Sequence, residues 1–316
     1  MHFSSTVLAL AATFTAANAA QKGYKGFNTG STFSTGANKQ QVDFAYEMKA
    51  AQELPNTDGA WTSVRLYTMI QGGTTDTPIS AIPAAIETNS TLLLGLWASE
   101  TSDVFQNEIN ALKNAITQYG TAFTDIVTGI SVGSEDLYRA SINGVGATPD
   151  QVVDYISQTR AAIKGTSLEG KPVGHVDTWD AFTAAANTAV ISAIDFLGMD
   201  AYPYYQPSSP GGNAIGNANT TFWKAYTDTV GAAQGKPVWI TETGWPIVGD
   251  TDGAAVPGAD NARTYWQETI CHALANDINM YYFQLQSSQG QVVNPDWGIK
   301  PAGDIVNEPA RFELTC

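Results

Sequence analysis

The sequence predicts one α/β domain folded as a single (β/α)8 TIM barrel. Short apolar and β-branched segments alternate along the chain with amphipathic stretches of helical spacing. Such alternation predicts a parallel sheet with right-handed crossovers, and about eight strands close the sheet into a barrel. The spacing of two strand ends along the chain agrees with an eight-stranded barrel. Glu135 and Glu242 follow the fourth and seventh predicted strands, with about 36 residues per β/α unit between them, close to the roughly 30 of a ~250-residue barrel.

The eight predicted strands are, in chain order, Tyr24–Asn28, Ser63–Tyr67, Thr91–Trp97, Ile126–Val132, Pro172–Asp177, Ala193–Tyr202, Pro237–Thr241 and Asn279–Gln284. Between them, residues 105–119 carry apolar side chains at helical spacing. Thr148 begins another helix as its N-cap, with Pro149 in the first turn, and residues 261–275 form a third. No internal repeat or interdomain linker interrupts the chain, so residues 20–316 are expected to form one catalytic barrel.

Composition and the N-terminus indicate a secreted protein. The 316 residues carry a net charge of -15, which argues against nucleic-acid and anionic-membrane partners, and the 43% hydrophobic content excludes a disordered chain. Residues 1–19 resemble a signal peptide, because a short apolar stretch precedes the Ala17-Asn18-Ala19 cleavage pattern. We find no apolar tail of the kind that directs a lipid anchor. The expectation is a secreted, extracellular monomer.

Two cysteines and two sequons fit that compartment. Cys271 and Cys316 are expected to form one disulfide that ties the C-terminus to a late helix, the alternative being two free thiols. Asn89 and Asn219 each begin an N-x-[ST] glycosylation motif and would lie on the surface if used.

Two carboxylates at strand ends point to the chemistry. Glu242 follows a predicted strand and precedes a Gly-Trp-Pro turn, and Glu135 follows another strand. A barrel brings such strand ends to one rim, where a pair of carboxylates is typical of glycoside hydrolysis. The alternative is that each Glu only caps the helix that follows. We assign Glu135 as acid/base and Glu242 as nucleophile, since the like charge of ionised Glu242 favours a protonated Glu135.

Other residues near strand ends are candidates for support and substrate binding. Arg65 and Tyr67 alternate with core residues and are expected to point toward Glu242, although Arg65 could equally form a structural ion pair. Sugar faces pack on aromatic rings, so we favour sugar contact for Tyr202 and Trp245. Three further expectations concern Trp and Asp side chains. Trp179 is undecided, Trp61 and Trp239 belong to the core, and Asp177 and Asp200 either bind sugar hydroxyls or cap helices.

Other chemistries lack their motifs. The histidines are His2, His175 and His272, with no HExxH and no Cys/His cluster, so no metal is expected. There is no GxGxxG after the first strand, no P-loop and no G-x-S-x-G elbow, so no nucleotide cofactor and no serine triad are expected.

Two segments resemble the signature segments of glycoside hydrolase family 17, namely residues 132–139 (VGSEDLYR) and 242–246 (ETGWP). Similar matches run along the chain at residues 64–67, 94–97, 174–179 and 199–204, and the likeness is to fungal cell-wall β-1,3-glucanases. The resemblance implies a retaining endo-1,3-β-glucanase on a TIM barrel, with Glu135 and Glu242 as the carboxylates. Ser134 stands where related barrel hydrolases have Asn, and Gln284 where several relatives have Glu, which removes a charge near the cleft.

The leading hypothesis is therefore hydrolysis of β-1,3-glucan through a covalent glycosyl-enzyme. A β-1,3-glucanosyltransferase would use the same two glutamates, a non-catalytic glucan-binding wall protein would need only one, and a related enzyme could cut mannan or cellulose. The expected substrate-binding residues are Tyr67, Ser134, Asp177, Asp200, Tyr202 and Trp245.

Overall fold

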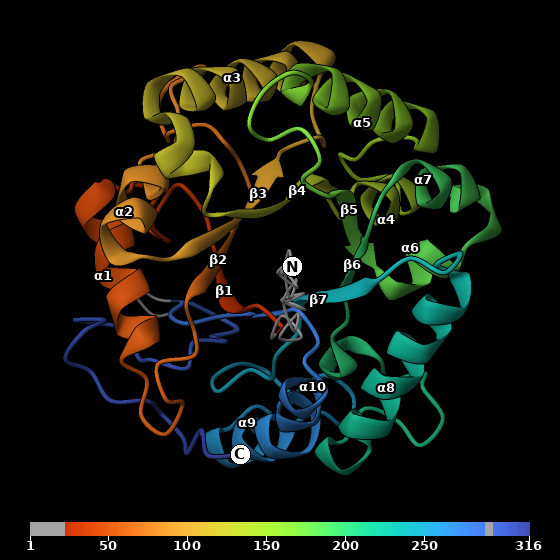
Figure 1. Ribbon diagram of the computed structural model, residues 1–316. Coiled ribbons are helices and arrows are strands. Elements are labelled where there is room, and N and C mark those ends of the chain that lie inside the picture. The colour runs from red at the N-terminus through yellow and green to blue at the C-terminus, as the bar shows by residue number, and fades with distance from the viewer. Residues whose placement is uncertain (1–22, 288–292) are drawn as a thin grey trace, which may run out of the picture.

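The computed structural model describes residues 23–287 and 293–316. Eight parallel strands form a closed barrel in which each strand pairs with the next in sequence and β8 pairs with β1 (Figure 1). The strands are β1 Lys25–Thr29, β2 Ser63–Leu66, β3 Thr91–Leu96, β4 Val127–Ser134, β5 Val173–Thr178, β6 Leu197–Asp200, β7 Val238–Glu242 and β8 Met280–Tyr282. The predicted TIM barrel is confirmed. The predicted signal peptide lies outside the described residues.

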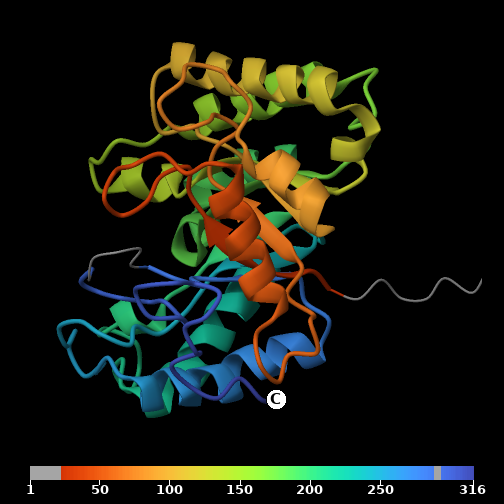
Figure 2. The same ribbon diagram turned by 90° about the vertical axis from the view of Figure 1, so that its left-hand side faces the viewer.

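Helices surround the barrel. They are α1 Gln41–Gln52, α2 Ala81–Thr88, α3 Ser102–Thr124, α4 Asp136–Ser141, α5 Pro149–Ile163, α6 Trp179–Thr183, α7 Thr188–Ala193, α8 Ile215–Ala232, α9 Ala259–Tyr265 and α10 Cys271–Ala275. The view turned by 90° shows α1 and α2 packed together against the outside of the strands (Figure 2). Among the described residues, we find no helix with the length and apolar character needed to cross a membrane.

Two predicted elements differ in detail. The predicted strand Ala193–Tyr202 is shortened, because Ala193 ends α7 and only Leu197–Asp200 pair in the sheet. The predicted helix over residues 261–275 is α9 and α10 joined by a π-helical turn at Trp266–Ile270. The predicted start of α5 is confirmed, with Thr148 accepting from the N–H of Gln151 in a capping box.

Aromatic side chains fill the core on both faces of the strands, as expected of parallel strands covered by helices. Trp61 stacks on Phe27 with ring centroids 4.7 Å apart. Trp239 stacks on Phe196 at 4.1 Å. Both tryptophans are buried, as predicted.

The C-terminal segment is tied to the outer layer. Cys271, at the start of α10, forms a disulfide with Cys316. The predicted pairing is therefore present in the structure.

Candidate active site

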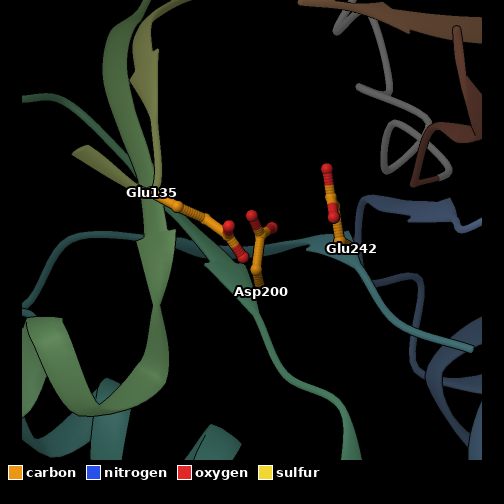
Figure 3. A group of neighbouring side chains, drawn as sticks. All are labelled: Glu135, Asp200 and Glu242. Atoms are coloured by element: carbon orange, nitrogen blue, oxygen red, sulfur yellow. The ribbon is translucent and has the colours of Figure 1, made fainter. Parts of the chain in front are cut away.

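The two predicted glutamates meet at the C-terminal rim of the barrel. Glu242 is the last residue of β7, Glu135 directly follows β4, and Asp200 is the last residue of β6. One carboxyl oxygen of each lies within 4.8 Å of the others. Figure 3 shows the Glu135 side chain directed toward Asp200, with Glu242 on the far side of Asp200. This separation suits a retaining glycosidase, whose carboxyl groups lie about 5–5.5 Å apart.

Two donors hold the Glu242 carboxylate. Arg65 donates from Nη1 to Oε1 at 2.6 Å, and the Tyr202 hydroxyl donates to Oε2 at 2.7 Å. The Arg65 guanidinium also donates to Asn28 Oδ1 and to Ser134 Oγ, both at 2.9 Å. Since these partners come from β1, β4 and β7, Arg65 on β2 fixes the strand ends as well as the charge. The buried guanidinium and the phenol thus hold both oxygens of this side chain in one orientation, as an attacking group requires.

The two tyrosines beside Glu242 remain neutral donors. Burial and the charge of Glu242 raise the pKa of Tyr202 well above its usual value, and the same causes raise the pKa of Tyr67. The Tyr67 ring lies 4.9 Å from the Arg65 guanidinium, in a cation–π arrangement. Both predicted side chains are therefore placed in the site with their hydroxyl protons retained.

Glu135 has the surroundings of a general acid. It adopts the left-handed conformation, with φ 57°, at the N-cap of α4. Burial and the nearby charge of Glu242 raise the pKa of Glu135 to about 7, while Arg139 opposes the rise. The Arg139 guanidinium lies 3.4 Å from Glu135 Oε2. Glu135 is consequently protonated in mildly acidic solution and can donate to a leaving oxygen.

Asp200 is a third acid in the same place. It is buried, and its Oδ1 accepts from the Thr241 hydroxyl at 2.7 Å, while Oδ2 has no hydrogen-bond partner among the described residues. Burial, followed by the charge of Glu242, raises its pKa well above the usual value. Burial and the charge of Glu242 thus favour the neutral form of Asp200 beside both glutamates, and Asp200 caps no helix.

The structure corrects the expectations for Asp177 and Trp245, which have no exposed surface. Asp177 accepts the backbone N–H groups of Leu137 at 2.8 Å and Tyr138 at 3.3 Å, so it caps α4 and has no oxygen facing a sugar. The indole N–H of Trp245 donates to the Val256 carbonyl at 3.0 Å, because the loop after β7 folds over the ring. Neither side chain reaches the cleft.

Sequence reasoning did not select the aromatic group that surrounds Tyr202. Phe283 follows β8 and lies 5.9 Å from Tyr202 between ring centroids, and Trp297 lies at 5.0 Å. Tyr205 is exposed and packs against Trp297 at 5.7 Å. The one signal that could have found Phe283 is its position at the end of the eighth strand. Trp179, left undecided above, is half-buried and lines a groove of about 440 Å³ with Tyr205.

A second cavity, of about 280 Å³, lies between the ends of β1 and β8 and is lined by α1 as well. Asn28, which accepts from Arg65, is part of its wall, as is Gln284. Lys39 and Glu47 form an ion pair of 2.6 Å in the same wall. Asn28 therefore links this polar cavity to the Arg65 that holds Glu242.

Curated relatives carry names of one kind. The chain is 49% identical over 299 residues to the probable glucan endo-1,3-beta-glucosidase eglC of Aspergillus oryzae, covering 93% of this chain and 63% of that protein. It is 48% identical to the protein of the same name from Aspergillus fumigatus, covering 100% and 69%. It is 29% identical to the glucan 1,3-beta-glucosidase of Saccharomyces cerevisiae, covering 100% and 99%. The chain thus spans about two thirds of the length of the Aspergillus proteins.

Solved structures share the fold. A glycoside hydrolase family 17 beta-1,3-glucanosyltransferase from Rhizomucor miehei has a TM-score of 0.73 and 24% identity, covering 93% of this chain and 98% of that one. An endo-laminarinase from Formosa has a TM-score of 0.71 and 14% identity, covering 88% and 83%. At these identities the likeness concerns the fold.

The family itself follows from a match over most of the chain. Residues 30–296 match the BtgE/BtgC glycoside hydrolase domain. The resemblance to glycoside hydrolase family 17 is thereby confirmed, and the chain belongs to the BtgE/BtgC glycoside hydrolase domain family.

Proposed function

We propose that this protein is a retaining endo-β-1,3-glucanase that works through a covalent glycosyl-enzyme. The observation that carries the proposal is the approach of the Glu135 and Glu242 carboxyl oxygens within 4.8 Å, with opposite environments. Glu242 is held by two donors, while burial and like charge favour a protonated Glu135. The names of the curated relatives support β-1,3-glucan as the substrate.

In the first step, the Glu242 carboxylate attacks the anomeric carbon and the glycosidic C–O bond breaks. The leaving oxygen takes the proton of Glu135. Arg65 and Tyr202 keep the attacking carboxylate in place through their hydrogen bonds to its two oxygens. The products of this step are a glycosyl ester on Glu242 and a shortened glucan.

In the second step, Glu135 removes a proton from the incoming water, whose oxygen attacks the anomeric carbon and releases Glu242. The charge of Glu242 is absent from the ester, so one cause of the raised pKa of Glu135 is lost and the group can act as a base. The same residue thus serves as acid and then as base.

Four side chains are proposed to bind the sugar next to the cleaved bond, namely Tyr67, Ser134, Asp200 and Tyr202. Ser134 Oγ accepts from Arg65, which leaves its own proton free to be donated to a sugar hydroxyl. The aromatic group of Tyr202, Phe283 and Trp297 would pack against pyranose faces, and the cavity between β1 and β8 would extend the cleft.

Incubation with linear β-1,3-glucan tests the proposal, with product length and initial anomeric configuration followed by NMR. We expect internal cleavage with β-configured new ends, and a loss of at least about 10³-fold in the variant Glu242→Gln. Glu268→Gln, at an exposed helical position, is the matched control and should leave activity unchanged. Release of α-configured ends, or an active Glu242→Gln variant, would contradict the mechanism. Binding of the glucan by the parent protein without any cleavage would instead favour a protein that only binds glucan.

Transfer of the glycosyl group to another sugar is the second candidate. The groove lined by Trp179 and Tyr205 lies beside the catalytic rim and offers an aromatic surface for an acceptor chain. A transferase would give products longer than the laminari-oligosaccharide supplied, and a hydrolase only shorter ones. A panel that includes mannan and cellulose tests the choice of β-glycan.

We also propose that the protein is secreted and monomeric. The Cys271–Cys316 disulfide supports an oxidising compartment. Asn89 is exposed at the end of α2, whereas Asn219 is half-buried in α8 and its Oδ1 accepts from Thr269 at 3.4 Å. Glycosylation is therefore expected at Asn89 before Asn219. Mass spectrometry of protein from a eukaryotic culture medium and light scattering check these points.

A further inference from the structure

The backbone that presents Glu135 departs from regular strand geometry. The pairing of β4 with β5 shifts register between Ser131 and Ser134, and Gly133 has φ +84°. Glu135 itself has φ 57°, a conformation that costs a non-glycine residue free energy and persists only where neighbours enforce it. A bulge at a strand end re-aims the side chain that follows. The direction of the Glu135 carboxyl group therefore depends on whatever holds this turn.

Three consecutive residues of β5 hold it. The carbonyl of Val176 accepts the N–H of Glu135 at 2.9 Å. His175 Nδ1 lies 2.6 Å from the carbonyl oxygen of Val132, before the turn. Asp177 accepts the N–H groups that follow the turn, those of Leu137 and Tyr138 described above. Residues 175–177 of β5 thus contact the turn both before and after Glu135.

The protonation of His175 follows from its partners. A carbonyl oxygen can only accept, so Nδ1 carries a proton. Nε2 lies 3.0 Å from Asp177 Oδ2, and the two oxygens of Asp177 act as acceptors for the backbone N–H groups of Leu137, Tyr138 and Thr178. The remaining proton therefore belongs to Nε2, which makes the ring an imidazolium. Burial alone would lower the pKa of His175, but the hydrogen bond and charge of Asp177 and the charge of Asp136 raise it.

The pair is sealed from solvent, since neither side chain has exposed surface. The other acid whose charge acts on His175 is Asp136, and its Oδ1 accepts from the Ser99 hydroxyl at 2.5 Å. Neither His175 nor Asp177 reaches the cleft, so both act only through the turn.

We propose that His175 and Asp177 form a buried ion pair that positions Glu135, so that both are positioning residues for the proton transfer to the leaving group. The inference rests on the proposed function, in which Glu135 is the acid/base. In this proposal Asp177 contributes to catalysis by holding Glu135 in position and does not contact the sugar. Truncating either partner leaves the other buried and unpaired, and the turn then relaxes.

Two substrates distinguish positioning from general stability. A laminari-oligosaccharide has a poor leaving group that needs an acid, whereas a dinitrophenyl β-laminarioligosaccharide does not. Since a general acid contributes about 10²–10⁴-fold, we expect Asp177→Asn and His175→Gln to lose about 10²-fold in kcat/KM on the first substrate and less than about 10-fold on the second. His272→Gln, an exposed histidine on α10, is the matched control and should change neither.

The reference variant is Glu135→Gln, which should show the same dependence on the leaving group and form a β-glycosyl azide when azide is added. If Glu135→Gln slows both substrates equally, the proposed function fails. If it behaves as expected but Asp177→Asn slows both substrates equally or neither, the ion pair does not position the acid. Asp177→Asn keeps the side-chain shape and an acceptor for the N–H of Leu137. It therefore still tests the role of the ion pair if His175→Gln does not fold.

Discussion

The charge on Arg139 should set the alkaline limit of activity, because this residue opposes the raised pKa of Glu135. Its guanidinium lies 3.4 Å from Glu135 Oε2, and about a quarter of each side chain is exposed. At that distance two unit charges in a water-like dielectric interact by about 1.2 kcal/mol, which corresponds to just under one pH unit. In Arg139→Gln the carboxylate loses this stabilisation, so the pKa of Glu135 rises from about 7 and the acid stays protonated to higher pH.

The assay is kcat/KM for laminari-oligosaccharide cleavage between about pH 5 and 9, which reports the groups of the free enzyme. We expect the alkaline limb of Arg139→Gln to move upward by about one pH unit. Arg139→Lys keeps the charge but loses the fork that donates to the Ser134 carbonyl at 3.0 Å, so its limb should stay while its rate falls. Arg263→Gln, on the surface of α9, should change neither. A limb that moves downward or stays fixed in Arg139→Gln would refute the electrostatic coupling.

Three further predictions concern other parts of the structure. Arg65→Lys should lower kcat about 10²-fold in a folded protein, because one ammonium cannot replace a buried fork with three partners; unchanged kcat would exclude its role in orienting Glu242. Cys316→Ser opens a loop of sequence separation 45 and should destabilise the fold by about 2–4 kcal/mol, seen as a lower Tm; an unchanged Tm would contradict this. Burial raises the pKa of Glu108 to about 7, above its unfolded value, so its contribution to stability is present below about pH 4.5 and lost as pH rises toward 7. Between these pH values the Tm of Glu108→Gln should therefore fall less than the Tm of the parent protein. An equal fall would show that Glu108 does not destabilise the fold as pH rises.

The fold could be predicted because each strand of the barrel is short, apolar and separated from the next by a helix. The error at the sixth strand has a physical cause. Residues 190–197 are almost continuously apolar, and such a run does not distinguish a buried helix end from a buried strand. In the structure, α7 takes the first part and β6 begins only at Leu197.

The candidate site could be predicted only in part, since the sequence places four carboxylates at strand ends and separates the two glutamates from the two aspartates but does not show which aspartate joins them. The four are Glu135, Asp177, Asp200 and Glu242. Register shifts at the ends of β4 and β6 decide which of them meet, and a bulge has no local sequence signature that we could use. The prediction that Trp245 contacts sugar is wrong for a similar reason. Its ring is buried by a later part of the chain, where the Val256 carbonyl accepts its indole N–H, and the residues next to Trp245 in the sequence do not indicate this contact.

Glu135, Asp200 and Glu242 lie so close together that their negative charges would repel one another, and this limits which of them can be ionised during the reaction. Full ionisation would place three negative charges within 4.8 Å of one another, against the two guanidinium groups of Arg65 and Arg139, which would be costly in a buried site. Raised pKa values favour the neutral forms of Asp200 and, below about pH 7, of Glu135, and the Glu242 carboxylate pairs with Arg65 at 2.6 Å. When Glu242 becomes an ester, Glu135 has given up its proton and carries the negative charge in its place. The net charge of the two glutamates is therefore the same before and after the first step, and the charge that appears on Glu135 lies 3.4 Å from the Arg139 guanidinium. The raised pKa of Asp200 favours this exchange, since a second negative charge there would oppose ionisation of either glutamate.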